Sequence, residues 1–208
     1  MKTSRQADIA AILKTAFACA IFFTAAATLG AQASPAKSAS PAAKRAAPAE
    51  LTLIDLAGYT QAVSKYHGKP LLVTFWATWC EPCELEFPMM VDLARQYEPQ
   101  GLAVFGVNMD DDSDMALVRH FLAKNHPDFR SFRQKPGIDL DGFYRGVNPA
   151  WDGAMPETIF YDRDGRIAGH FIGLQPRAAY ERAIKAILAG PAASNVPSNP
   201  RTSRAAGR

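Results

Sequence analysis

Two cysteines separated by two residues are the part of this sequence best suited to chemistry. They are Cys80 and Cys83, within the segment FWATWCEPCELEFP at 75–88. Such a pair can be a redox disulfide, half of a metal site or two buried thiols. A disulfide between them would close a very short loop and restrict the unfolded chain little. This weakens a purely structural role and favours a catalytic one.

The segments around the pair predict how the two sulfurs are placed. Residues 71–75 form a short apolar run typical of a buried strand, and 82–97 predict a helix with Pro82 in its first turn. Free N–H groups and the dipole at a helix start favour negative charge, so Cys80 should ionise more readily than a free cysteine. The spacing lets Cys83 attack a mixed disulfide formed on Cys80, which predicts a two-step exchange.

A metal site is less well supported by the sequence. A structural zinc needs four ligands, usually including a second pair of cysteines or histidines. The four histidines show no paired spacing; they are His67, His120, His126 and His170. A covalent haem site would need histidine directly after Cys83, where the chain has Glu84. The acidic run 110–114 lacks the EF-hand spacing and is expected to be a solvated loop that caps a helix. We therefore expect no metal.

The two ends of the chain differ in composition from its middle. Residues 1–33 predict an export signal, with a positive start, an uncharged, largely apolar run at 16–29 and the small-x-small sequence AQA at 31–33. The run is shorter than the roughly 20 residues of a spanning helix, so we expect cleavage, with an uncleaved anchor as the alternative. Residues 34–50 and 190–208 predict a disordered linker and a disordered tail.

The charge of the remaining segment, 51–189, argues against a nucleic-acid surface. The whole chain has a formal net charge of +3. Within 51–189, however, 14 Lys and Arg face 18 Asp and Glu, a net charge of 14 − 18 = −4. The basic character therefore belongs to the ends of the chain, whereas a nucleic-acid-binding domain needs a basic face of its own.

Hydrophobic patterning in this segment predicts strands that alternate with helices. Such an alternation is typical of an α/β domain with helices on both faces of a sheet. Besides the strand and helix around the cysteines, we expect strands at 51–56, 102–107, 158–161 and 167–172, and helices at 60–66, 114–125 and 177–188.

These residues resemble a known family. The sequence WATWCEPC at a strand-to-helix junction resembles thioredoxin-fold oxidoreductases, and AMPET at 154–158 is similar to their cis-proline segment. With GKP at 68–70, EFP at 86–88 and the export signal, residues 51–189 resemble the TlpA/ResA/CcmG group of exported thiol–disulfide oxidoreductases. The resemblance implies a thioredoxin-like fold with a central mixed β-sheet and helices on both faces.

The resemblance also implies a role for each matched residue. Cys80 would be the exposed nucleophile and Cys83 the resolving thiol. Pro156 should follow a cis peptide bond, which places the backbone of Met155 beside the pair for hydrogen bonding to a substrate strand.

Neighbouring residues are expected to tune this chemistry. Glu86 matches a carboxylate that tunes the thiols in ResA-like members, where a partly buried carboxylate raises the pKa of nearby thiols. Alternatively, it is a first-turn acid that complements the helix dipole. Thr74 stands where thioredoxin keeps a buried acid, which leaves Glu86 as the candidate for proton transfer. Glu81 adds negative charge that favours a reductant, and Trp79, Glu81 and Pro82 are expected to contact substrate.

The predicted function is thiol–disulfide exchange in the periplasm or another exported location, without an organic cofactor. The resemblance suggests reduction of exported proteins such as apocytochrome c, and a membrane protein that donates electrons to the pair. A thiol peroxidase of the same fold and a copper carrier are the alternatives, although the Thr-x-x-Cys and Cys-x-x-x-Cys patterns that they use are missing. Residues 126–154 form either a partner-recognition insert or a segment packed on the domain.

Overall fold

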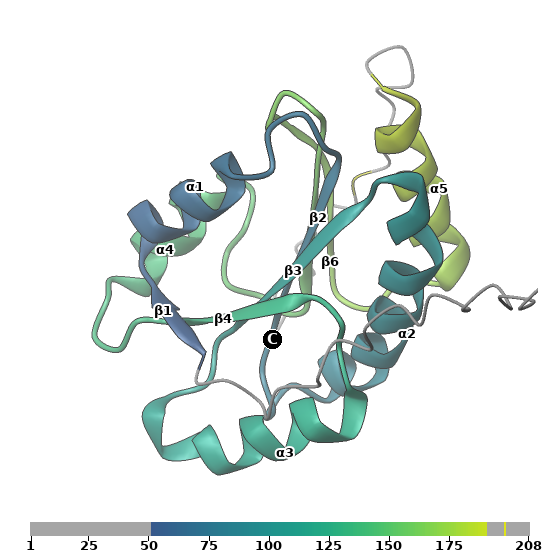
Figure 1. The fold of residues 1–208 in the computed structure, drawn as a ribbon. Coiled ribbons are helices and arrows are strands. Elements are labelled where there is room, and N and C mark those ends of the chain that lie inside the picture. Colours follow the sequence, from purple (N-terminus) through teal and green to yellow (C-terminus); the bar gives the residue numbers. More distant parts are fainter. Residues whose placement is uncertain (1–50, 191–197, 199–208) are drawn as a thin grey trace, which may run out of the picture. The chain divides into compact units, whose positions relative to one another are not determined.

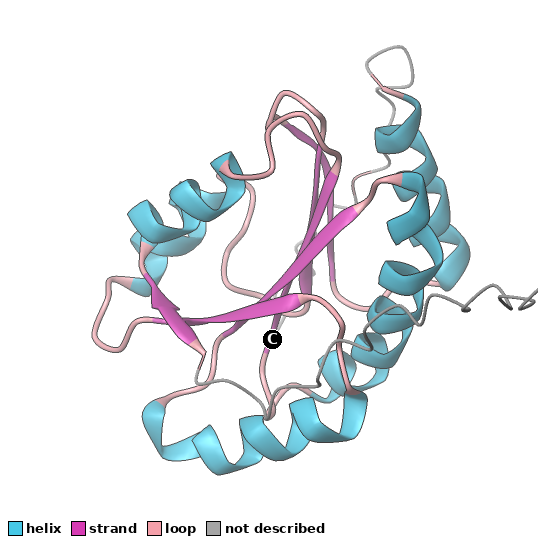
Figure 2. Ribbon diagram, viewed as in Figure 1, coloured by secondary structure: helices cyan, strands magenta, loops and turns pink. Residues whose placement is uncertain are grey.

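The computed structural model describes residues 51–190 and Ser198. The expected export signal (1–33), linker (34–50) and nearly all of the expected tail (190–208) lie outside the described residues. Figures 1 and 2 show the described part as a central sheet with helices packed around it. This arrangement confirms the predicted α/β class.

A six-stranded mixed sheet forms the centre of the fold. Its strands are β1 (Thr52–Ile54), β2 (Leu71–Trp76), β3 (Ala103–Asn108), β4 (Arg130–Gln134), β5 (Glu157–Tyr161) and β6 (Ile167–Ile172). They lie in the order β1-β4-β3-β2-β5-β6. The first four in this order are parallel, whereas β5 is antiparallel to β2 and β6 is antiparallel to β5. All residues of β2 are buried, as its unbroken apolar run predicts.

Five α-helices cover the two faces of this sheet. They are α1 (Leu56–Ser64), α2 (Glu81–Tyr97), α3 (Met115–Asn125), α4 (Leu140–Val147) and α5 (Arg177–Ala189). On one face, the ring of Phe75 lies 5.6 Å from that of Tyr59 in α1. On the other face, Trp76 lies 4.8 Å from Phe87 of α2 and 4.7 Å from Phe121 of α3. Figure 1 shows α4 beside α1, and α5 beside α2.

None of the helices in the described part combines the length and the apolar character that crossing a membrane requires.

Several expected boundaries differ from the structure by one or two residues, and the largest difference is at the first strand and helix: the expected strand 51–56 is the shorter Thr52–Ile54. The first helix begins at Leu56 rather than at residue 60, because Asp55 caps it by accepting a hydrogen bond from the backbone N–H of Gly58 at 2.9 Å. Strand β4 and helix α4 were not predicted at all. Strand β4 has the sequence RSFRQ, which lacks an apolar run, and α4 is short and contains two glycines.

Residues 126–154 are packed on the domain. They supply β4 between β1 and β3, and α4 buries Phe143 and Val147 against the core. Trp151 is 1 % exposed, with its ring 4.5 Å from Phe75 and 4.5 Å from Tyr144. This segment is therefore part of the hydrophobic core rather than an appendage.

Removing the Trp151 ring should destabilise the whole domain. We expect Trp151→Ala to lower the free energy of unfolding by about 3 to 5 kcal/mol, because it leaves a large cavity beside Phe75. Urea denaturation of the oxidised protein measures this loss. Trp79→Ala is the matched control, since Trp79 is 63 % exposed and its removal should change stability by less than about 1 kcal/mol. Equal losses in the two variants would contradict the packing described for this segment.

Candidate active site

The two cysteines form a disulfide at the start of α2. Their Cα atoms lie 5.2 Å apart. Cys80 follows the buried strand β2 and is the N-cap residue of α2, and the backbone N–H of Cys83 donates to its Sγ at 3.2 Å. A sulfur that accepts this hydrogen bond, at the positive end of a helix dipole, is favoured as a thiolate when the disulfide opens. The arrangement can therefore exchange a disulfide in two steps.

The exposure of Cys80 is lower than expected. In the disulfide form, Cys80 is 6 % exposed and Cys83 is 1 % exposed, so the sequence-based picture of an openly exposed nucleophile is wrong for this state. The physical reason is the capping geometry, which turns the Cys80 side chain back towards the helix N-terminus and the core.

The residues expected to contact substrate lie around the disulfide. Trp79, Glu81 and Pro82 are exposed on either side of Cys80, and Trp79 has an exposed fraction of 63 %. The Met155–Pro156 peptide bond is cis, as the resemblance implied. It immediately precedes β5, whose first residue pairs with the end of β2 just before the cysteine loop. Met155 is partly buried and packs against the core cluster that contains both cysteines.

Glu86 lies in the interior, between the sheet and α5. It is 1 % exposed, although it belongs to the helix that carries the cysteines. The hydroxyl of Tyr180 donates to its Oε2 at 2.5 Å, and that of Thr158 donates to its Oε1 at 3.1 Å. Glu86 also has a hydrogen bond with the side chain of Thr74. The alternative of a first-turn acid that complements the helix dipole is therefore wrong, because the acids in the first turn of α2 are Glu81 and Glu84, whereas Glu86 follows them and is turned towards the sheet.

Burial controls the acidity of Glu86. Loss of hydration raises the pKa of its carboxyl from 4.5 to about 7, even though the hydroxyl groups of Tyr180, Thr158 and Thr74 act in the opposite direction. A carboxyl with this pKa can hold or release a proton near neutral pH. Thr74, at the strand position where thioredoxin keeps an acid, thus contacts an acid supplied by the neighbouring helix.

A second buried acid, Asp110, holds the loop that leads to the cysteines. It is fully buried, and its carboxylate accepts hydrogen bonds from the backbone N–H of Thr78 at 2.9 Å and from the Thr78 hydroxyl at 2.5 Å. Asn108 donates to the same carboxylate at 2.5 Å. The expectation of a wholly solvated loop at 110–114 is wrong at its first residue. Asp110 lies two residues after the end of β3, at the sheet edge where the cysteine loop also begins.

A third buried acid was missed by sequence reasoning. Glu157 follows Pro156 directly and is fully buried. The only signal for it was its place inside the AMPET segment. Among residues 51–190 and Ser198, no group of three or more His, Cys, Asp and Glu side chains is arranged to hold a metal ion.

Comparisons with known proteins agree with this geometry. The model of the AhpC/TSA family matches residues 43–170. The thiol-disulfide oxidoreductase ResA of Bacillus thuringiensis (strain Al Hakam) is 32 % identical over 64 % of this chain and 72 % of its own length. The thiol:disulfide interchange protein DsbE of Pseudomonas fluorescens biotype C is 38 % identical over 51 % of this chain and 53 % of its own.

A solved structure shows the same similarity in three dimensions. The crystal structure of a putative thiol:disulfide interchange protein DsbE from Chlorobium tepidum superimposes with a TM-score of 0.51 at 29 % sequence identity. The match covers 61 % of this chain and 84 % of that one.

The raised pKa of Glu86 predicts a pH-dependent stability. Between about pH 4.5 and about pH 7 the unfolded chain has released the Glu86 proton while the folded protein still holds it, so the folded state loses stability as the pH rises through this range. Glu86→Gln removes this loss. The quantity of interest is the free energy of unfolding of the variant minus that of the wild type. We expect this difference to be about 3 kcal/mol larger at about pH 8 than at about pH 4.5.

Urea denaturation of the oxidised protein at the two pH values measures this difference. Glu181→Gln is the matched control, because Glu181 lies on the surface of α5 in an ion pair with Arg177 and should give nearly the same difference at both pH values. A Glu86→Gln difference that does not change with pH would show that Glu86 is not the group held protonated.

Proposed function

Since the chain belongs to the AhpC/TSA family and is a thiol–disulfide oxidoreductase of the ResA and DsbE type, we propose that it is exported and reduces disulfides in other exported proteins, apocytochrome c among them. The observation that carries the proposal is the Cys80–Cys83 disulfide at the N-terminus of α2, with exposed Trp79 and Pro82 beside it. Export is supported by the signal-like sequence at 1–33.

The proposed reaction is a two-step exchange. The Cys80 thiolate attacks one sulfur of the substrate disulfide, forms a mixed disulfide and releases the other substrate sulfur as a thiolate, which takes up a proton. Cys83, once deprotonated, then attacks Cys80, restores the Cys80–Cys83 disulfide and releases the second substrate thiol. The substrate gains two electrons and the protein loses two. A dithiol protein of the membrane returns them by the same exchange in reverse.

Charge around the pair supports a reducing role. Glu81 and Glu84 lie in the first turn of α2, and Glu86 becomes charged at about neutral pH. Negative charge near the thiols disfavours the thiolate, which belongs to the reduced form. The reduced form is therefore less stable here than in an oxidant of the same fold whose cysteines are flanked by cations. A pair with a destabilised reduced form gives up electrons readily. We assign Glu86 as the group that exchanges protons with the pair.

The peroxidase and copper-carrier alternatives are distinguished by direct measurements. A peroxidatic cysteine would follow threonine by three residues, but Ala77 stands three residues before Cys80. Consumption of hydrogen peroxide by the reduced protein faster than its reaction with protein disulfides would favour the peroxidase. Copper that stays bound through gel filtration would favour the carrier.

Removing the resolving thiol should trap the substrate. We expect Cys83→Ala, expressed in the native host, to accumulate proteins joined to Cys80 by mixed disulfides, because the second step cannot occur. Mass spectrometry of the trapped proteins identifies the substrates, and cytochrome c precursors should be among them. Cys80→Ala is the matched control and should trap far less. If Cys83→Ala traps nothing and the wild type does not reduce insulin, the proposed function is wrong.

The charge of Glu86 should raise the pKa of the cysteine thiols. Glu86→Gln is expected to lower the pKa of the cysteine pair by roughly one, because it removes a buried negative charge one helical turn away. The pH dependence of alkylation of the reduced protein measures this pKa. Glu84→Gln is the control, since this exposed side chain is screened by solvent and should have a smaller effect. Equal effects of the two substitutions would contradict the role assigned to Glu86.

A further inference from the structure

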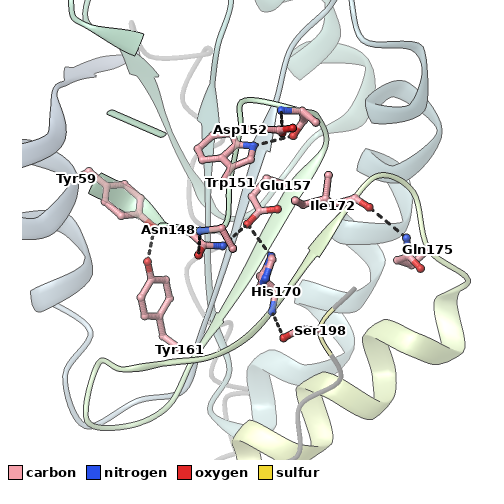
Figure 3. Close-up of polar contacts among 12 residues, drawn as sticks. Tyr59, Asn148, Trp151, Asp152, Glu157, Tyr161, His170, Ile172, Gln175 and Ser198 are labelled. Atoms are coloured by element: carbon pink, nitrogen blue, oxygen red, sulfur yellow. Dashed lines mark hydrogen bonds and ion pairs between the residues drawn. The ribbon is translucent and has the colours of Figure 1, made fainter. Parts of the chain in front are cut away.

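Glu157 belongs to a buried polar cluster beside the segment that carries Met155 (Figure 3). Its Oε1 accepts a hydrogen bond from Nδ2 of Asn148 at 2.9 Å and lies 3.3 Å from Nδ1 of His170. Its Oε2 is buried and has no hydrogen-bond partner in the part of the chain that the structure describes. We call these three residues the Asn148–Glu157–His170 cluster.

The cluster joins both ends of the segment that presents Met155. Asn148 is the C-cap of α4 and begins the segment, whereas Glu157 is the first residue of β5, directly after Pro156. His170 lies on the other side of Glu157, in the neighbouring strand β6. The backbone N–H of His170 donates to the hydroxyl of Ser198 at 3.2 Å. The two ends are thus connected through one buried carboxylate.

Bonds within the segment carry this constraint to Met155. The side chain of Asn148 accepts from the N–H of Ala150 at 3.1 Å, and that of Asp152 accepts from the N–H of Ala154 at 3.1 Å. The indole N–H of Trp151 donates to the carbonyl of Ala154 at 2.7 Å. The residue before Met155 is therefore held on both its N–H and its carbonyl group.

His170 is the basic neighbour of Glu157. Burial raises the pKa of the Glu157 carboxyl, whereas His170 beside it and the hydrogen bond from Asn148 lower that pKa. The other titratable groups that act on or respond to this carboxylate are acidic or phenolic: Asp152, Glu86, Tyr59 and Tyr161. Of the basic side chains in the described residues, only His170 pairs with it. His170 and Asn148 are therefore the two side chains that stabilise this buried carboxylate.

We propose that the Asn148–Glu157–His170 cluster consists of positioning residues that hold the Met155 backbone for hydrogen bonding to protein substrates. The inference rests on the proposed function, in which a substrate strand pairs with Met155. A loosened cluster weakens recognition of a polypeptide but leaves the reactivity of Cys80 unchanged. Small disulfides, which have no strand to pair, are reduced as before.

The experiment compares two substrates in single-turnover reactions of the reduced protein. One is insulin, whose backbone can pair with Met155, and the other is dithiobis(nitrobenzoate), a small aromatic disulfide without a peptide backbone. Both reactions consume the same Cys80 thiolate, so the ratio of their second-order rate constants cancels changes in thiol reactivity. This ratio is the quantity that reports on positioning.

Glu157→Gln should lower the insulin rate constant about tenfold, as expected for the loss of a charge-assisted hydrogen bond, and change that of the small disulfide less than about twofold. Asn148→Ala, which removes only one donor, should lower the insulin rate in the same selective way. Glu181→Gln on the surface of α5 is the matched control and should leave both rates unchanged. Thermal unfolding of each variant shows that it is folded.

Equal losses for both substrates would assign the cluster a purely structural role, and no loss for either would overturn the inference outright. If Glu157→Gln fails to fold, Asn148→Ala decides the question alone. If the wild type fails to reduce insulin, the proposed function is overturned instead, so the two failures are distinguishable.

Substitutions of His170 test its part in the cluster. His170→Leu removes the nitrogen that lies 3.3 Å from Oε1 of Glu157 and should lower the ratio of the insulin rate to the small-disulfide rate. His170→Asn places an amide N–H near the position of Nδ1, so its ratio should stay closer to that of the wild type. Equal ratios in the two variants would overturn the part assigned to His170.

Discussion

The N-terminus of α2 is the feature on which the rest of this molecule depends. Strand β2 runs through the buried centre of the sheet and delivers the chain to the sheet edge, where Cys80 caps the following helix and accepts the Cys83 N–H. A cysteine in this position lies against the positive end of a helix dipole. The disulfide therefore lies where its opening to a thiolate is electrostatically supported, and the surrounding acids moderate that support.

Buried carboxylates at the same sheet edge surround this helix start, and each has a different environment. Asp110 is saturated by hydrogen bonds from Thr78 and Asn108 and acts as an anchor for the cysteine loop. Glu86 accepts hydrogen bonds from neutral hydroxyl groups, which do not compensate for its lost hydration. Its pKa is therefore raised to about 7, so the carboxyl can exchange a proton near neutral pH. Glu157 faces a histidine that can carry the compensating charge. The roles assigned to these carboxylates therefore differ with their partners: Asp110 anchors the loop, whereas proton exchange is proposed for Glu86 and positioning for Glu157.

The two faces of β5 separate two of these roles. Thr158 points towards Glu86 and the α2–α5 side of the sheet, whereas Glu157 points to the opposite face, where Asn148 and His170 lie. Strand alternation therefore places the proton exchange proposed for Glu86 on one side of the strand and the positioning proposed for Glu157 on the other. Because Glu157 and Thr158 are the two residues after Pro156, both sides adjoin the same short stretch of backbone.

Much of this protein follows from local sequence patterns. Apolar runs located β2 and β3, and the Cys-x-x-Cys spacing before a helix indicated disulfide exchange, because each depends on residues close together in the chain. The cis bond at Pro156 was implied by the resemblance of the segment before β5 to a known family. Strand β4 and helix α4 escaped prediction because their burial comes from neighbours such as β1, β3 and α1 rather than from their own composition. The sequence also did not indicate which side chains contact the buried acids. Whether Glu86, Asp110 and Glu157 are solvated or buried is decided by side chains up to 94 residues away, and only the tertiary structure brings those side chains together.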